Sequence, residues 1–123
     1  MMKFSCVLVI LGLALASAAP ARELPELVSE CEACHGPGGV SSELDVPSLA
    51  GNSVNYLREM LDQFYNYERH CKTTTYRHGD RAKIPMSMCT VANALSEDEK
   101  QALAEYFAGA AVAPPIEDQG LPR

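Results

Sequence analysis

The feature that most constrains this chain is the run C-E-A-C-H at residues 31–35, which places two thiols and an imidazole at positions i, i+3 and i+4. On an α-helix these positions share one face, so Cys31, Cys34 and His35 would all point the same way. Two thiols that can bond the vinyl groups on one porphyrin edge, followed at once by an imidazole that can reach the iron, are typical of covalent haem attachment. The run therefore predicts one haem c, held through Cys31 and Cys34 and ligated by His35.

Two other uses of a C-x-x-C pair fit the sequence less well. A thioredoxin-like redox disulfide lies in a βαβ setting, and no strand pattern flanks the motif. A structural zinc site usually needs a second closely spaced pair, whereas Cys71 and Cys89 lie far apart in the chain. Neither use explains the histidine that follows the second cysteine.

The N-terminal residues 1–18 are typical of a cleaved secretory signal. Lys3 supplies the positive charge, residues 7–16 the apolar stretch, and Ala16-Ser17-Ala18 a small-residue cleavage site. The apolar stretch is short for a membrane span, and no later stretch approaches twenty apolar residues, so we expect a periplasmic protein with no span in its mature chain. Cys6 would leave with the signal, and four cysteines would remain in an oxidising compartment.

The chain has 123 residues, enough for one domain with a small core in which a bound macrocycle would itself become core material. We place this domain at residues 19–110 and a flexible proline-rich tail at 111–123. From Ala19 onward, nine Lys and Arg residues stand against sixteen Asp and Glu residues. This negative balance argues against nucleic acid as a partner.

Positive charge is concentrated in one stretch, residues 69–83, where Asp80 is the one acidic residue. Such a stretch is either a solvated loop or a docking patch for an acidic partner, and the sequence leaves both open. The basic residues are Arg69, Lys72, Arg77, Arg81 and Lys83.

Apolar spacing predicts three main helices. The first covers about residues 23–35 and ends at the glycine-rich run 36–39. The second covers about 53–67, is capped by Asn52 or Ser53, and buries Val54, Leu57, Leu61 and Phe64. Tyr56 on this helix is either a core aromatic or a contact of the haem propionates.

The last helix has the clearest start signal, because Ser96 and Glu99 form a capping-box pattern followed by apolar residues to about position 110. Between the second and last helices, residues 68–87 lack apolar periodicity and are expected to be irregular. A connection this long in a compact domain is often functional.

In this order, a helix with C-x-x-C-H, the segment P-S-L-A-G at 47–51, a helix, a methionine-bearing loop and a final helix resemble the short bacterial class I cytochromes c over about residues 24–110. The resemblance implies an all-α fold of three to five helices around one covalently bound haem. It also implies that the Pro47 carbonyl accepts a hydrogen bond from His35. Leu49 would pack on the haem.

The second axial ligand follows from the same resemblance. In relatives with a similar start to the last helix, the ligand methionine lies eight residues before the capping serine, which corresponds to Met88 here. A thioether is a soft ligand suited to this role. Met86 is the runner-up, and His70 or His78 remain alternatives.

The chain departs from that family pattern at Cys71 and Cys89, which remain after haem attachment. In an exported protein we expect them to form a disulfide that ties the methionine loop to the chain leaving the second helix. A copper-binding or sulfur-reactive thiol pair is the alternative.

The resemblance therefore implies a monohaem carrier that passes single electrons between redox partners. The same chain, with its Met-Cys step and basic loop, also resembles the cytochrome subunit of flavocytochrome c sulfide dehydrogenases, where a flavoprotein subunit is the partner. A haem or copper enzyme acting alone is a third reading, and it lacks a recognisable His/Arg pair for peroxide cleavage.

Overall fold

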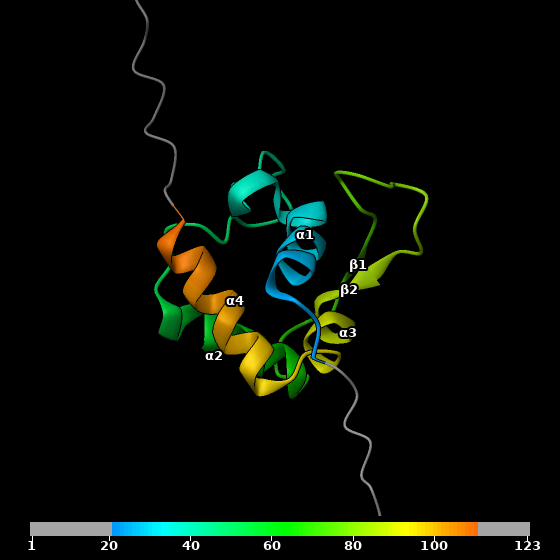
Figure 1. Ribbon diagram of the computed structural model, residues 1–123. Helices are drawn as coiled ribbons and strands as arrows, with labels where there is room; N and C mark the ends of the chain where they lie inside the picture. Colours follow the sequence, from blue (N-terminus) through cyan, green and yellow to red (C-terminus); the bar gives the residue numbers. More distant parts are fainter. Residues whose placement is uncertain (1–20, 111–123) are drawn as a thin grey trace, which may run out of the picture.

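The computed structural model describes residues 21–110, and Figure 1 shows a group of helices with one projecting hairpin loop. The expected signal and tail lie outside these residues. No helix in the described part is long and apolar enough to cross a membrane. The elements are α1 (Leu24–His35), the short turn η1 (Pro37–Gly39), α2 (Val54–Tyr65), β1 (Thr73–Thr74), β2 (Met86–Ser87), α3 (Met88–Asn93) and α4 (Glu97–Gly109).

Helices α1, α2 and α4 enclose one apolar core, and the prediction of an all-α fold is confirmed. α4 packs against both α1 and α2, while α3 packs against α2 (Figure 1). Burial of the apolar faces stabilises this arrangement by roughly 25 cal/mol per Å² of apolar surface removed from water. The buried core residues are Leu27, Val28, Leu57, Leu95, Leu103, Ala104 and Phe107.

The first helix ends where the sequence predicts, at Gly36. This residue has φ +85°, and a side chain there would collide with the carbonyl oxygen of Val40. Only glycine accommodates both the left-handed backbone and this close approach. The motif therefore occupies the last turn of α1, directly before a sharp change in chain direction.

The second helix begins after Ser53, whose hydroxyl accepts a hydrogen bond from the Tyr56 amide at 3.1 Å. Of the predicted apolar stripe, Leu57 is buried, and Val54, Leu61 and Phe64 are half-buried. Tyr56 is 47% exposed and does not belong to the apolar core cluster.

The capping box of α4 is present as predicted. The Ser96 hydroxyl accepts from the Glu99 amide at 3.2 Å, and the Glu99 carboxylate accepts from the Ser96 amide at 2.8 Å. These bonds satisfy two amides that a helix start otherwise leaves without partners.

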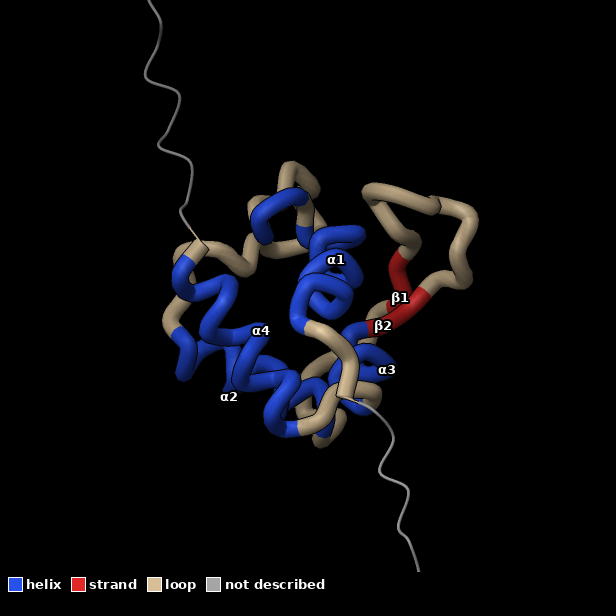
Figure 2. Tube along the Cα trace, viewed as in Figure 1, coloured by secondary structure: helices blue, strands red, loops and turns tan. Residues whose placement is uncertain are grey.

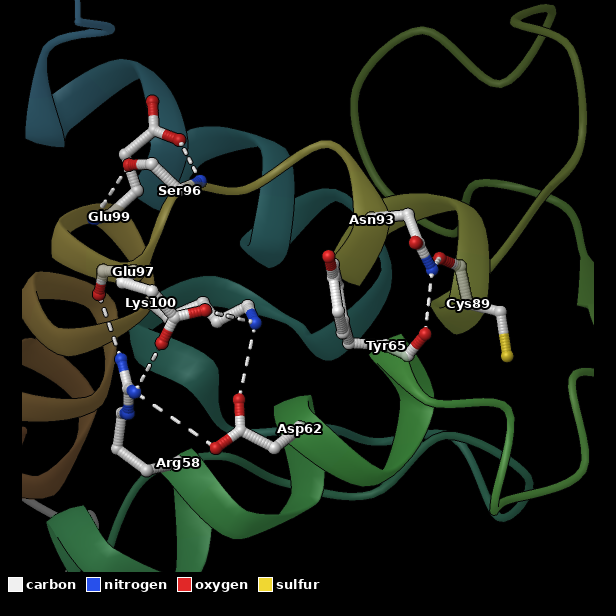
Figure 3. A network of polar contacts seen from close by, with 9 residues as sticks. All are labelled: Arg58, Asp62, Tyr65, Cys89, Asn93, Ser96, Glu97, Glu99 and Lys100. Carbon is white, nitrogen blue, oxygen red and sulfur yellow. Dashed lines mark hydrogen bonds and ion pairs between the residues drawn. The ribbon is translucent and has the colours of Figure 1, made fainter.

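A polar network joins α4 to α2 beneath this cap (Figure 3). The Lys100 ammonium is almost fully buried and donates to Asp62 at 3.2 Å and Glu97 at 2.8 Å. Arg58 binds Glu97 at 2.7 Å, and the ring centroid of Tyr65 lies 4.2 Å from the ammonium. Burial works to lower the pKa of Lys100, but its two carboxylate bonds raise it overall, so the buried amine stays charged.

The segment 68–87 is more ordered than the sequence predicts. Strands β1 and β2 pair in antiparallel fashion, with Thr73 opposite Ser87 and Thr74 opposite Met86, and α3 follows at once (Figure 2). Two-residue strands show no alternation in a sequence, and α3 is only six residues long, so neither leaves a periodic signal. The 75–85 loop between the strands projects beside α1.

Candidate haem site

Cys31, Cys34 and His35 lie on the last turn of α1, as the i, i+3, i+4 spacing predicts. Both cysteines are free thiols, and Cys31 packs against the core cluster. The imidazole is only 6% exposed. One face of α1 therefore presents two thiols and a buried imidazole at the boundary of the apolar core.

The His35 ring is oriented by a backbone acceptor. Its Nδ1–H donates to the carbonyl oxygen of Pro47 at 2.6 Å, which leaves Nε2 as the nitrogen able to bind a metal. This is the contact that the family resemblance assigns to Pro47.

The loop that supplies this carbonyl is itself held in place. The Gly39 carbonyl accepts from the amides of Leu49 at 2.8 Å and Ala50 at 3.1 Å. Gly39 has φ +74°, and a Cβ added there would lie 2.6 Å from the Phe107 ring. The chain returning from η1 thus runs tightly against α4, and this contact fixes the segment that carries Pro47.

Burial controls the protonation of the motif. Desolvation raises the pKa of the Cys31 thiol to about 12 and lowers the pKa of the His35 imidazole, against which the bond to Pro47 acts more weakly. The imidazole is therefore neutral at pH 7, and a neutral imidazole is the form that ligates iron. Two free thiols beside a neutral, oriented imidazole fit a covalently attached haem.

The two predicted haem-contact residues differ in position. Leu49 is half-buried and packs against the core cluster. Tyr56 lies at the surface of α2. The structure thus places Leu49 beside the apolar core that also contacts the motif.

Among the candidates for the second axial ligand, Met88 is half-buried at the start of α3. Met86, the runner-up, is more exposed, and its sulfur accepts from the Tyr76 hydroxyl at 3.6 Å. His70 is exposed. His78 lines a groove with Ser29, Glu30, Glu32 and Ala33, on the side of α1 opposite to the motif face, which argues against it as a ligand of the same iron.

The segment that carries Met88 is attached to the rest of the fold at both ends. Cys71 and Cys89 are joined by a disulfide with a Cα–Cα distance of 5.6 Å. The Asn93 side chain donates to the carbonyls of Cys89 at 2.9 Å and Tyr65 at 3.3 Å (Figure 3). Together they tie α3 to the end of α2 and to the chain that follows it.

Sequence reasoning missed the role of Arg77. Its guanidinium binds Asp45 at 2.7 Å and Glu43 at 3.4 Å. Its amide and that of His78 both donate at 2.8 Å to the carbonyl of Ala33, inside the motif. A lone arginine in a basic stretch gives no sequence signal of such a contact. It anchors the 75–85 loop to the turn of α1 that bears the cysteines.

A small helical fold with a C-x-x-C-H turn and a backbone-oriented histidine defines a c-type haem protein. The chain belongs to the cytochrome c family, which it matches over residues 24–110. Family membership makes it an electron-transfer protein and implies a covalently bound haem c and redox partners.

The chain is also similar to a protein of Stutzerimonas stutzeri (strain A1501) named "Thiosulfate dehydrogenase electron acceptor". The two are 40% identical over 82 residues, which is 66% of this chain and 32% of that protein. The chain therefore spans about a third of the length of the relative.

Proposed function

We propose that this chain is a periplasmic monohaem electron carrier, with haem attached through Cys31 and Cys34 and iron ligated by His35 and Met88. The observation that carries the proposal is the buried His35 ring, whose Nδ1 is bonded to Pro47 and whose Nε2 is left for a metal. A haem bound here supplies reversible one-electron exchange.

Neighbouring residues orient the two proposed iron ligands, and the identity of those ligands sets the reduction potential. Pro47 fixes the imidazole plane, and the disulfide and Asn93 hold the segment that presents the Met88 thioether. A His/Met ligand pair raises the reduction potential relative to two histidines. If His35 and Met88 both ligate the iron of a bound haem, no ligand site would remain open for peroxide or another substrate, which would favour electron transfer.

For the electron donor, we propose a dehydrogenase that oxidises a reduced sulfur compound. The support is the similar Stutzerimonas protein, whose name assigns it as the electron acceptor of a thiosulfate dehydrogenase. A free carrier that serves such an enzyme is the first candidate.

A second candidate is the cytochrome subunit of a flavocytochrome c sulfide dehydrogenase. The observation that favours it is the Cys71–Cys89 disulfide directly beside Met88. With both sulfurs paired, a copper-binding thiol site at these residues is disfavoured.

The haem part of this proposal is tested on protein exported from its full-length gene. We expect cleavage after Ala18, one covalent haem per chain by mass spectrometry, and the haemochrome spectrum of two thioether bonds. Slow or absent binding of carbon monoxide to the reduced protein supports a six-coordinate carrier. Rapid stoichiometric binding would contradict it. A Cys31→Ala, Cys34→Ala variant that still carries covalent haem would also overturn it.

The choice of donor is tested by following haem reduction in stopped flow. Reduction by a purified thiosulfate dehydrogenase plus thiosulfate, with the chain eluting as a free monomer, supports the first candidate. Copurification with a flavin-containing chain across an interface of about 1,600 Å² or more, and reduction by sulfide, would instead identify the subunit.

A further inference from the structure

The positive charges of this protein fall into two groups in the structure. Outside residues 69–83, the described cations are Arg22, Arg58 and Lys100, and each is paired with a carboxylate. Within that stretch Arg77 is paired as well. The cations with no carboxylate partner among residues 21–110 are therefore all in this stretch.

Three of these cations are exposed along the hairpin: Arg81 and Lys83 lie in the 75–85 loop, and Lys72 directly precedes β1 at the base of the hairpin. Ile84, which directly follows Lys83, is 83% exposed and adds an apolar side chain to this charged stretch. We call these four residues the loop patch. Figure 2 shows the loop extending from the two strands beside α1.

The loop patch is attached to the haem motif. The amides of Arg77 and His78 both bond the Ala33 carbonyl, one residue before Cys34. Arg77 also binds Asp45 and Glu43, so the first half of the loop is anchored both to α1 and to the 43–45 segment. A partner bound at Arg81, Lys83 and Ile84 would lie beside the turn of α1 that carries Cys31 and Cys34, the residues that would attach a haem.

We infer that the loop patch is the docking surface for an acidic face of a redox partner protein, an inference that rests on the proposed electron-carrier function. Exposed cations without a carboxylate partner, followed in the chain by an exposed apolar side chain, match the mixed charged and apolar composition of a protein interface. On a chain whose net charge is −6, such a patch also orients the approach of a negatively charged partner.

A protein partner fits this surface better than the other possible occupants. Binding to anionic lipid gains about 1 kcal/mol per cation and commonly uses four to eight of them, more than the patch offers. A second copy of the chain is disfavoured because both copies carry the same negative net charge.

The location of the surface is tested first, with a probe that needs no electron transfer. Hexacyanochromate(III), a redox-inert paramagnetic anion, is added to the haem-loaded protein at low ionic strength, and amide line broadening is mapped by NMR. We expect broadening at residues 72 and 81–84. Broadening spread evenly over the surface, or centred on another segment, would overturn the inference.

Electron transfer is then compared between two variants of equal net charge. The patch variant removes three positive charges through Lys72→Gln, Arg81→Gln and Lys83→Gln. The control variant adds three negative charges along the α2–α4 face through Asn55→Asp, Asn66→Asp and Gln101→Glu. With hexacyanoferrate(III) as oxidant at low salt, we expect the rate constant of the patch variant to be about three- to tenfold lower than that of the parent. The rate constant of the control variant should fall by less than about 1.5-fold. High salt should remove the difference. Equal slowing in both variants would contradict the inference.

Two further measurements distinguish a protein partner from the other possible occupants, and a failure of the docking surface from a failure of the proposed electron-carrier function. Dimerisation at low salt that Ile84→Ser abolishes, or patch-dependent binding to phosphatidylglycerol vesicles, would assign the surface to a second copy or a membrane and overturn the inference. Covalent haem and reversible reduction are measured in the same samples. Their absence refutes the carrier function, whereas their presence with no mapped patch refutes the docking surface alone.

Discussion

The two sides of the candidate haem site are built in opposite ways. On one side, Cys31, Cys34 and His35 come from a single helical turn, and the acceptor for His35 is twelve residues away. On the other side, Met88 owes its position to Cys71, Asn93 and the end of α2, which are distant in sequence or joined by side-chain contacts. The first side is encoded locally, and the second depends on tertiary contacts.

This difference predicts different sensitivities. A locally encoded ligand should survive changes elsewhere in the fold, because its helix and glycine stop remain intact. A ligand held by distant contacts should be lost when any one of them is removed, since the short α3 helix has too few residues to be stable alone.

The largest effect is expected from removing the disulfide. Cys71→Ala together with Cys89→Ala should lower the free energy of unfolding by about 3 kcal/mol, because the bond closes a loop with a sequence separation of 18. We also expect weaker Met88 ligation with haem attachment unchanged, measured by guanidinium unfolding and the far-red absorption band.

Reductant provides the control for this prediction. Dithiothreitol should lower the stability of the parent to that of the double variant and leave the variant unaffected. Equal stability of parent and variant under oxidising conditions would show that the pair does not stabilise the Met88 segment.

A somewhat smaller effect tests the contact with α4 that holds the Pro47 segment on the His35 side. Gly39→Ala places a Cβ 2.6 Å from the Phe107 ring at a φ of +74° and should destabilise the protein by about 2–3 kcal/mol. Gly38→Ala, at φ +64° with open space around its Cβ, is the matched control and should cost about 1 kcal/mol. If thermal unfolding shows equal losses, the close contact with α4 is unimportant.

The smallest effect concerns α4, which packs on both α1 and α2. Ser96→Ala should cost about 1 kcal/mol through loss of the helix cap, without altering Met88 ligation.

Bonds from the Ser96 amide and then Arg22 lower the pKa of Glu99 below its usual 4.5. The stabilisation by Glu99 is therefore complete above pH 4.5 and lost as the pH falls through the lower folded-state pKa.

Thermal melts at pH 7 and pH 3 measure this contribution. Glu99→Gln keeps the capping geometry but cannot titrate, so it should lose less stability between these pH values than the parent. An identical loss in both proteins would show that Glu99 does not contribute to the acid sensitivity.

The sequence predicts the local parts of this architecture well. α1 with its motif, α2 and the capped α4 were predictable because periodic apolar residues and helix-end residues specify each within a short window. The β1–β2 pairing, α3 and the Arg77 contacts were not, since two-residue strands and a single ion-paired arginine leave no pattern. Tyr56, for which the sequence left open a core position or a propionate contact, lies outside the apolar core because its helical position only borders the buried stripe.

The most direct test of the account compares Met88→Ala with Met86→Ala in the haem-loaded ferric protein. Far-red absorption and the reduction potential are recorded for both, because a sulfur ligand on ferric iron gives the band and raises the potential. We predict that Met88→Ala loses the band and has a lower potential, while Met86→Ala retains both. A band that persists in Met88→Ala, or disappears only in Met86→Ala, would contradict the assignment of Met88 as the second iron ligand.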